Sequence, residues 1–252
     1  MRYRVRALVA GLLAAALLSG CAQSVDPIER LGKKAAQKVR PREAAYRRWG
    51  LVAPLARPPR PPARTAARTA GPGLLPVVDH VATRDRVVFL TYDDGAERDP
   101  RFVDMVRELR LPVSMFLTDS VVGPGYGHFA QLRAVGASVQ NHTLDHASLR
   151  GLPYVGQRAE ICGQQEKLKR RFGIRPRLLR PPYGRYDATT LRAAADCGVA
   201  ALVLGRETGV GPLRAGEILV IPDEPGLTGA TTRLLRRVQA QGYGLGRLED
   251  YL

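Results

Sequence analysis

Apolar and polar positions alternate along most of the chain in a pattern of short strands and longer amphipathic helices. Arg86–Thr91 (RVVFLT) is a short apolar run that predicts a buried strand. Asp99–Leu109 follows, and its residues Phe102, Val103 and Val106 recur at helical spacing. The same pattern predicts strands over Pro112–Thr118, Ala137–Asn141, Arg177–Arg180, Val199–Leu204 and Ile218–Ile221, and helices over Phe129–Val135, Gly156–Phe172, Ala188–Cys197 and Thr228–Gln241.

Strands that alternate with helices favour parallel βα units. About six or seven such units within residues 74–252 predict an α/β fold, either a (β/α) barrel or an open sheet, and the pattern alone leaves both open. In both architectures functional residues lie at the carboxyl ends of the strands.

The first twenty residues are typical of a secretory signal. Arg2, Arg4 and Arg6 precede an apolar run from Ala7 to Leu18, which is short for a membrane span. The run ends in Leu-Ser-Gly-Cys21, which resembles a bacterial lipobox, so we expect cleavage before Cys21 and its lipidation. An ordinary signal peptide with an incidental Cys is the alternative. The lipobox predicts a protein anchored to the bacterial cell membrane on its extracytoplasmic face.

Residues 21–73 differ in composition from the rest of the chain. They allow a short basic helix around Ile28–Trp49, and then Pro54–Gly73 is rich in Pro, Arg, Ala and Thr. Such a stretch favours extended polyproline II and serves as a spacer. We therefore divide the chain into a signal (1–20), a basic, Pro-rich tether (21–73) and a catalytic domain (74–252).

The positive charge belongs mainly to the segment before the domain. The chain carries a formal +16, of which residues 1–20 contribute three Arg, and residues 21–71 contribute twelve Lys or Arg against three acids. Residues 72–252 therefore carry only +4. With no nucleic-acid motif present, this balance argues against a nucleic-acid partner. The basic segment suits an anionic membrane or wall polymer, or is simply a solvated tether.

Three polar clusters each follow a predicted strand. Tyr92-Asp93-Asp94-Gly95 follows the first, Asn141–His146 follows the third, and Arg180–Gly184 follows the fourth. The carboxyl ends of parallel strands meet on one face, so we expect these clusters to converge.

The histidines of the second cluster suit a metal. On a helical turn, the His-x-x-x-His spacing of His142 and His146 puts both imidazoles on one side. Two His and a carboxylate such as Asp94 make a three-ligand site, although the His pair alone could be two unrelated surface residues. The neighbouring Asp93 could then take a proton from water, although two Asp before a Gly often form a turn. Arg180 could orient Asp93 or form a surface ion pair.

Together, TYDDG, HTLDH and RPPYG resemble the first three motifs of the polysaccharide deacetylase family, the NodB-like carbohydrate esterases. The resemblance implies a distorted (β/α) barrel of the NodB type with fewer than eight strands. It also implies hydrolytic removal of N-acetyl or O-acetyl groups from polysaccharides such as chitin-like glycans, peptidoglycan or acetylated xylan.

The resemblance assigns a role to each matching residue. Asp93 matches the general base, Arg180 matches the residue that positions it, and Tyr183 offers a backbone N–H to the oxyanion. The implied metal ligands, usually for zinc, are Asp94, His142 and His146. The implied substrate-binding residues are Pro182, Tyr183 and Val220.

The fourth and fifth family motifs are divergent. Leu204–Gly209 occupies the position of the fourth motif but lacks the Trp that the family has there. Pro222 occupies the position where the fifth motif has a proton-donating His. Asp223 or Glu224 could replace that acid if burial raised its pKa.

Two functions therefore stay open. The first is a metal-dependent hydrolase that deacetylates a cell-envelope or extracellular polysaccharide by cutting a non-peptide carbon–nitrogen bond, with activity weakened by the missing His. The second is a glycan-binding lipoprotein that keeps the metal site. Cys162 and Cys197 could form a disulfide outside the cytoplasm, but their sequence positions do not decide this.

Overall fold

A computed structural model describes residues 45–61, 75–95, 98–209, 211–221 and 226–252. Its strands are β1 (Val77–Val78), β2 (Val87–Asp94), β3 (Val113–Leu117), β4 (Ser138–Asn141), β5 (Leu178–Leu179), β6 (Ala201–Val203), β7 (Arg206–Glu207), β8 (Ile218–Ile221) and β9 (Gly244–Gly246). Its helices are α2 (Pro100–Leu109), α3 (Asp119–Val122), α4 (Tyr126–Ala134), α5 (Tyr154–Phe172), α6 (Ala188–Asp196) and α7 (Leu227–Ala240). Short 3₁₀ turns cover Gly123–Gly125, Pro182–Gly184 and Leu248–Asp250.

All the strands belong to one parallel, curled sheet. Its order is β1-β6-β5-β4-β3-β2-β8-β7, and β9 also pairs with β2. His80, just after β1, forms an antiparallel bridge with Glu217, just before β8. This bridge brings the two ends of the strand order together. The predicted α/β barrel is therefore confirmed, and the open sheet is not.

The sheet has nine strands among the described residues, more than the expected number below eight. Two of these strands add no full position to the barrel. β9 pairs with the start of the β2 edge that β3 occupies further along, and β7 is an exposed strand of two residues. Strands this short leave no hydrophobic period to detect, which is why the sequence pattern missed β1, β7 and β9.

Strand β2 shows how the sheet separates two apolar layers. Val88, Leu90 and Tyr92 pack into the cluster under the helices, whereas Val87 and Phe89 belong to the cluster on the opposite face. Successive side chains of a strand point to opposite faces. Thr91 and Asp93, at the next odd-numbered positions, therefore face the interior of the barrel.

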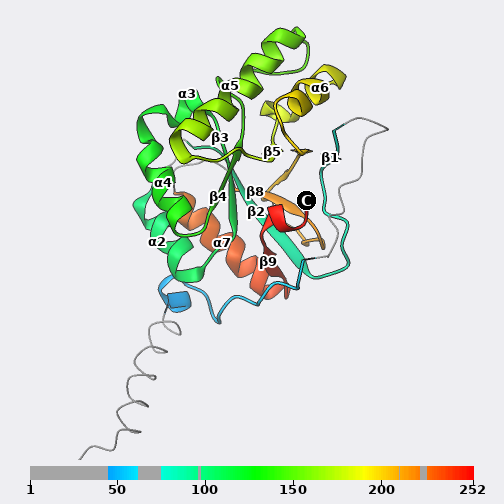
Figure 1. The fold of residues 1–252 in the computed structure, drawn as a ribbon. Coiled ribbons are helices and arrows are strands. Elements are labelled where there is room, and N and C mark those ends of the chain that lie inside the picture. The colour runs from blue at the N-terminus through cyan, green and yellow to red at the C-terminus, as the bar shows by residue number, and fades with distance from the viewer. Residues whose placement is uncertain (1–44, 62–74, 96–97, 210, 222–225) are drawn as a thin grey trace, which may run out of the picture. The chain divides into compact units, whose positions relative to one another are not determined.

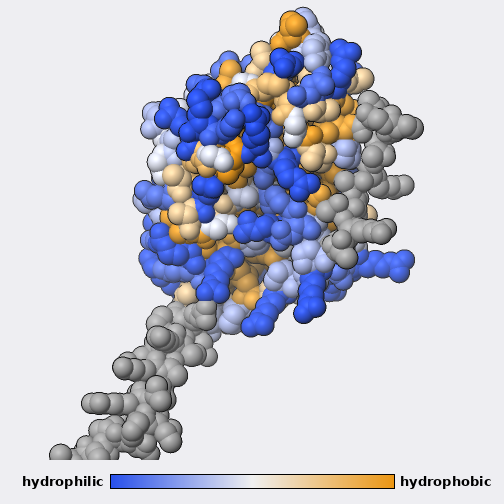
Figure 2. All heavy atoms as spheres, in the orientation of Figure 1, coloured by the Kyte–Doolittle hydropathy of each residue, from blue (hydrophilic) through white to orange (hydrophobic). Residues whose placement is uncertain are grey.

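Helices cover the outer face of the sheet (Figure 1). α2 packs against α4 and α7, while α5 packs against α6. α2 buries Phe102 and Val106 as predicted, and the Asp99 side chain caps its first turn by accepting a hydrogen bond from Arg101 N. α5 ends in three basic residues, which suit the negative end of the helix dipole. Figure 2, in the orientation of Figure 1, shows that the outer surface on this side is largely hydrophilic.

A disulfide joins the two packed helices. Cys162 of α5 and Cys197 at the end of α6 have their Cα atoms 5.1 Å apart and are bonded. The question that the spacing of the cysteines left open is therefore answered by the packing of α5 on α6.

Part of the segment expected as a tether packs on the domain. Trp49 and Leu51 are buried in the apolar cluster that contains α2 and α7. The Trp49 indole N–H donates to Glu108 Oε2 at 2.8 Å, and Tyr251 Oη donates to the Pro59 carbonyl at 3.1 Å. Residues 45–61 thus extend the packed unit, whereas the sequence pattern starts the domain at residue 74, because a Pro-rich segment shows no period even where it lies against a core.

The predicted signal, Cys21 and most of the predicted basic helix lie outside the described residues. Among the residues that are described, no helix combines the length and the apolar character that a membrane span requires.

Candidate metal centre and catalytic site

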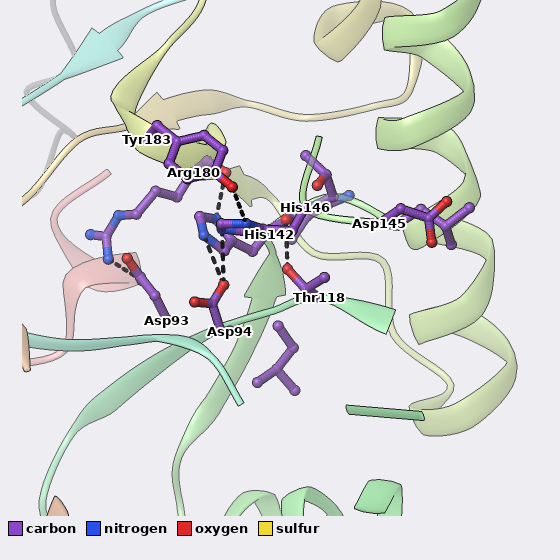
Figure 3. A network of polar contacts seen from close by, with 12 residues as sticks. Asp93, Asp94, Thr118, His142, Asp145, His146, Arg180 and Tyr183 are labelled. Atoms are coloured by element: carbon purple, nitrogen blue, oxygen red, sulfur yellow. Dashed lines mark hydrogen bonds and ion pairs between the residues drawn. The ribbon is translucent and has the colours of Figure 1, made fainter. Parts of the chain in front are cut away.

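The three predicted clusters converge at the carboxyl ends of β2, β4 and β5 (Figure 3). Asp93 and Asp94 end β2, His142 directly follows β4, and Arg180 directly follows β5. Asp93 and Arg180, which are 87 positions apart in the sequence, are thereby brought within hydrogen-bond distance of each other. The parallel sheet creates the site, because it aligns the strand ends on one face.

Asp94, His142 and His146 form a compact group of potential ligands. Asp94 Oδ1 lies 3.3 Å from His142 Nε2 and 3.1 Å from His146 Nε2. One ligand atom from each residue lies within 4.8 Å of the others. Two imidazoles and one carboxylate are the donor set of many catalytic zinc sites.

The hydrogen bonds around this group indicate that a cation belongs between the three side chains. The Arg180 carbonyl oxygen lies 2.8 Å from His142 Nδ1, and a carbonyl only accepts, so Nδ1 carries the hydrogen. Burial lowers the pKa of His142 and favours its neutral form, although Asp93 and Asp94 oppose this shift. The neutral ring then turns the lone pair of Nε2 toward Asp94 Oδ1.

Asp94 Oδ1 is itself a buried atom for which no hydrogen-bond partner is found among the described residues. A buried carboxylate oxygen that faces an imidazole lone pair needs a positive charge to compensate it. The donor set and its surroundings therefore fit a divalent metal.

The site carries most of the unusual backbone of the molecule. Asp94 (φ 61°), Thr143 (φ 73°), His146 (φ 59°) and Tyr183 (φ 59°) are left-handed, and the one other such non-glycine residue described is Arg110, at the end of α2. Left-handed backbone costs about 1 kcal/mol or more for residues with a Cβ atom. The strained non-glycine residues are therefore concentrated at the site.

His142 and His146 do not lie on a helical turn, which is the arrangement in which their spacing would have put both rings on one side. The segment after β4 is an irregular loop, in which the left-handed backbone of Thr143 and His146 turns both rings toward Asp94. A spacing of four is compatible with a helix but also with such a loop, so it did not decide between them.

Buried side chains hold this loop in place. Asn141 Oδ1 accepts from Thr143 N at 2.8 Å, and the Thr118 hydroxyl donates to the His142 carbonyl at 2.8 Å. Glu160 of α5 accepts from the backbone N–H groups of Leu144 and Asp145. These contacts replace the hydrogen bonds that a helix would have provided.

Arg180 and Asp93 form the second half of the site. The buried Arg180 donates from Nη1 to Asp93 Oδ1 at 2.5 Å and to Thr91 Oγ1 at 2.8 Å. Its guanidinium lies 4.1 Å from the centre of the Phe116 ring on the interior face of the sheet. One arginine therefore fixes the direction of the Asp93 carboxylate from a rigid support.

Sequence reasoning missed two residues that support Arg180. Thr91 lies two positions before Asp93 and so faces the same side of β2, a signal that the strand period contains. Gly205 leaves room for the guanidinium, since a Cβ atom there would lie 2.9 Å from Arg180 Nη2 and 2.5 Å from Val220 Cγ2. No signal in the sequence around Gly205 points to this contact.

The expected substrate-binding residues lie around the same strand ends. Pro182 is buried, whereas Tyr183 is 68% exposed. The Tyr183 ring lies edge-on to His146 with ring centres 4.8 Å apart, and its hydroxyl is 3.2 Å from His146 Nδ1. Val220 is partly buried in β8, directly opposite Thr91.

The acid side of the site is described only in part. Pro222, Asp223 and Glu224 lie outside the described residues. The divergent fourth motif forms the exposed strand β7, and the sole Trp of the chain, Trp49, packs against Glu108 of α2 instead. The described part of the site thus contains no tryptophan.

Comparisons with known proteins agree with this geometry. A sequence model described as polysaccharide deacetylase matches residues 80–202. The chain is 59% identical over 206 residues to the uncharacterized protein SCO4760 of Streptomyces coelicolor, an alignment that covers 76% of this chain and 82% of that protein. It is 33% identical over 123 residues to the chitin deacetylase of Amylomyces rouxii, which covers 47% of this chain and 28% of that enzyme.

A solved structure shows the same fold. The family 4 carbohydrate esterase from Bacillus anthracis aligns with a TM-score of 0.63 at 20% identity, over 69% of this chain and 86% of that one. At this identity the likeness concerns the fold of the barrel and not its substrate.

Proposed function

The chain belongs to the polysaccharide deacetylase family, and from this premise we propose that it is a metal-dependent hydrolase that removes acetyl groups from a cell-envelope polysaccharide. The proposal rests on one observation: a group of potential metal ligands and a carboxylate held by an arginine lie next to each other at the carboxyl ends of the strands. The Asp94, His142 and His146 group fits a divalent cation, and Asp93 is held beside it by Arg180.

The cation is held by Asp94 Oδ1, His142 Nε2 and His146 Nε2 in this proposal, with zinc as the expected metal. Bound there, it supplies Lewis-acid chemistry, which polarises an acyl carbonyl and makes water more acidic. Asp93 serves as the general base, because an ionised carboxylate with one oxygen committed to Arg180 still has a second oxygen to accept a proton from water.

The loop after β5 and strand β8 surround the acetyl group in this proposal. The backbone N–H of Tyr183 donates to the oxyanion that forms at the carbonyl. Val220 and Pro182 give an apolar surface to the acetyl methyl group. A peptidoglycan or chitin-like glycan is the proposed substrate.

The leaving group decides how much acid catalysis the site must provide. Pro222 has no proton to donate from its side chain, and losing a general acid typically costs about 10²–10⁴ in rate. Asp223 or Glu224 is the proposed replacement for an N-acetyl substrate. An O-acetyl ester leaves as an alcohol and depends less on this proton, so such esters are the second proposed substrate class.

The second candidate function is glycan binding without turnover. Pro222 and the absence of tryptophan from the described part of the site favour it. The pairing of Asp93 with Arg180 argues against it, because binding a glycan or a metal requires neither residue in that arrangement.

One experiment separates the two candidates. Metal content and acetate release are measured for the purified protein and for Asp93→Asn, with N-acetylated and O-acetylated glycans as substrates. The hydrolase proposal expects acetate from the unchanged protein and about 10²–10⁴-fold less from Asp93→Asn, with equal metal content in both. Equal acetate in both proteins, or none with metal bound, would exclude the hydrolase.

We also propose that the protein is a lipoprotein held on the extracytoplasmic face of a bacterial membrane through Cys21. The support is the basic start, the apolar run and the Leu-Ser-Gly-Cys sequence. Cys21→Ser should move the protein from the membrane fraction to the soluble extracytoplasmic fraction. Unchanged membrane association of Cys21→Ser would exclude a lipid anchor at this residue.

A further inference from the structure

Three groups of the short loop after β5 contact three different residues of the site (Figure 3). The Arg180 guanidinium binds Asp93, and the Arg180 carbonyl oxygen binds His142 Nδ1. The Tyr183 hydroxyl lies 3.2 Å from His146 Nδ1. The first contact concerns the base, but the other two concern the nitrogens of the metal-site histidines that face away from Asp94.

The roles of the two nitrogens of His146 follow from its position. Nε2 lies 3.1 Å from Asp94 Oδ1, on the side where the cation fits. A neutral imidazole that offers the lone pair of Nε2 to a cation must carry its hydrogen on Nδ1. The Tyr183 oxygen is therefore the acceptor of this hydrogen bond, and its own O–H hydrogen stays available to donate elsewhere.

The two histidines differ in how firmly they are held. His142 is almost fully buried and donates to a backbone carbonyl, whereas the His146 side chain keeps 24% of its surface exposed. For His146 the side chain of Tyr183 supplies both the hydrogen-bond acceptor and the ring against which the imidazole packs. Tyr183 thus holds His146 in position, as the Arg180 carbonyl and burial hold His142.

Stability does not explain the conformation of Tyr183. Its backbone is left-handed (φ 59°, ψ 14°), which is costly for a residue with a Cβ atom, and the residue stays 68% exposed. Exposed rings recover little free energy from burial. Strain that packing does not offset points to a functional contact.

We propose that Tyr183 is a positioning residue that links the metal site to the glycan. Its oxygen accepts the Nδ1 hydrogen of His146 and holds Nε2 toward Asp94, while its hydroxyl hydrogen and exposed ring face the polysaccharide. The inference rests on the metal site of the proposed function and adds to it a role for this side chain, beyond its backbone N–H.

The test is Tyr183→Phe, which keeps the ring and removes only the hydroxyl. Zn²⁺ affinity is measured by competition with a chromophoric chelator. Partners of metal-bound histidines typically contribute 10-fold to 100-fold in affinity, so a rise of at least about 10-fold in Kd is expected. The melting temperature of the metal-free variant should equal that of the unchanged protein.

Tyr154→Phe is the matched control. The Tyr154 hydroxyl also contacts a side chain, since it donates to Asp196 at 2.5 Å, but that contact joins α5 to the end of α6 and involves none of the proposed metal ligands. Its Zn²⁺ affinity should be unchanged. Equal Kd values for Tyr183→Phe and the unchanged protein, or equal losses in both variants, would overturn the inference.

The glycan contact has a separate readout. At saturating Zn²⁺, the KM of Tyr183→Phe for an acetylated glycan oligomer should rise roughly threefold to tenfold, the usual effect of losing one neutral hydrogen bond. An unchanged KM would remove the glycan from the inference. An unchanged protein that binds no Zn²⁺ would instead contradict the proposed function itself, so the two failures are distinguishable.

Discussion

Arg180 Nη1 lies 2.5 Å from Asp93 Oδ1, and the same nitrogen also donates to Thr91 Oγ1. Asp93 and Thr91 face the same side of β2, so a single guanidinium connects two positions of one strand to the end of another. The guanidinium packs on the Phe116 ring and lies so close to Gly205 that a Cβ atom there would collide with it. These two contacts leave it little freedom to move.

Gly205→Ala should therefore lower the proposed deacetylase activity without unfolding the protein. The added methyl group would lie 2.9 Å from Arg180 Nη2, so the arginine must shift and the Asp93 carboxylate with it. A displacement of about 1 Å at a catalytic group can cost up to 100-fold, and we expect a loss of about 10-fold to 100-fold in kcat/KM for acetate release.

Gly209→Ala is the control for this substitution. Among the described atoms, its Cβ would meet only the Glu207 carbonyl oxygen, at 4.0 Å. Its kcat/KM should match that of the unchanged protein. Equal rates for Gly205→Ala and Gly209→Ala would contradict the steric role of Gly205.

Asp187 should stabilise the protein in a pH-dependent way. It caps α6 by accepting from Thr190 N at 2.9 Å. Burial raises the pKa of Asp187, but hydrogen bonds from the backbone N–H groups of Thr190 and Gly151 outweigh it and lower the pKa below 3.8. Asp187→Ala should lower the free energy of unfolding by about 1 kcal/mol at pH 7.

The sign of the pH effect follows from the lowered pKa. A carboxyl with a lower pKa in the folded state contributes stability above its unfolded pKa of 3.8 and loses it as the pH falls through the folded value. The difference between Asp187→Ala and the unchanged protein should therefore shrink below pH 3.8 in urea unfolding. Asp187→Asn caps without titrating and should stay close to the unchanged protein at pH 7. A constant difference between Asp187→Ala and the unchanged protein at all pH values would argue against this contribution.

The Cys162–Cys197 disulfide should be a main source of stability. It closes a loop over a sequence separation of 35 residues, for which chain entropy predicts about 4 kcal/mol. The double substitution Cys162→Ala with Cys197→Ala should lower the free energy of unfolding by about 2–4 kcal/mol in urea titrations. Dithiothreitol should lower the stability of the unchanged protein but not that of the double variant.

Trp49 should report on the packing of residues 45–61. It is 5% exposed and is the one Trp of the chain, so its fluorescence should be blue-shifted in the native protein and shift to the red on unfolding. Trp49→Ala should cost roughly 3–5 kcal/mol, measured by circular dichroism during denaturation. Val52→Ala is the control, since Val52 is 88% exposed and its removal should change stability by less than about 0.5 kcal/mol. Equal stabilities of the two variants would show that this segment does not pack in solution.

The sequence by itself determined the order of the main strands and helices, because hydrophobic periods are local. It also placed Asp93, Asp94, His142, His146 and Arg180 at strand ends, which parallel βα topology brings to one face. The tertiary structure decided what depends on the path of the chain in space. The loop after β4 is irregular, Gly205 makes room for Arg180, Trp49 lies under the helices, and Tyr183 meets His146. These contacts join segments that are far apart in sequence or use left-handed backbone, and neither leaves a local period in the amino-acid pattern.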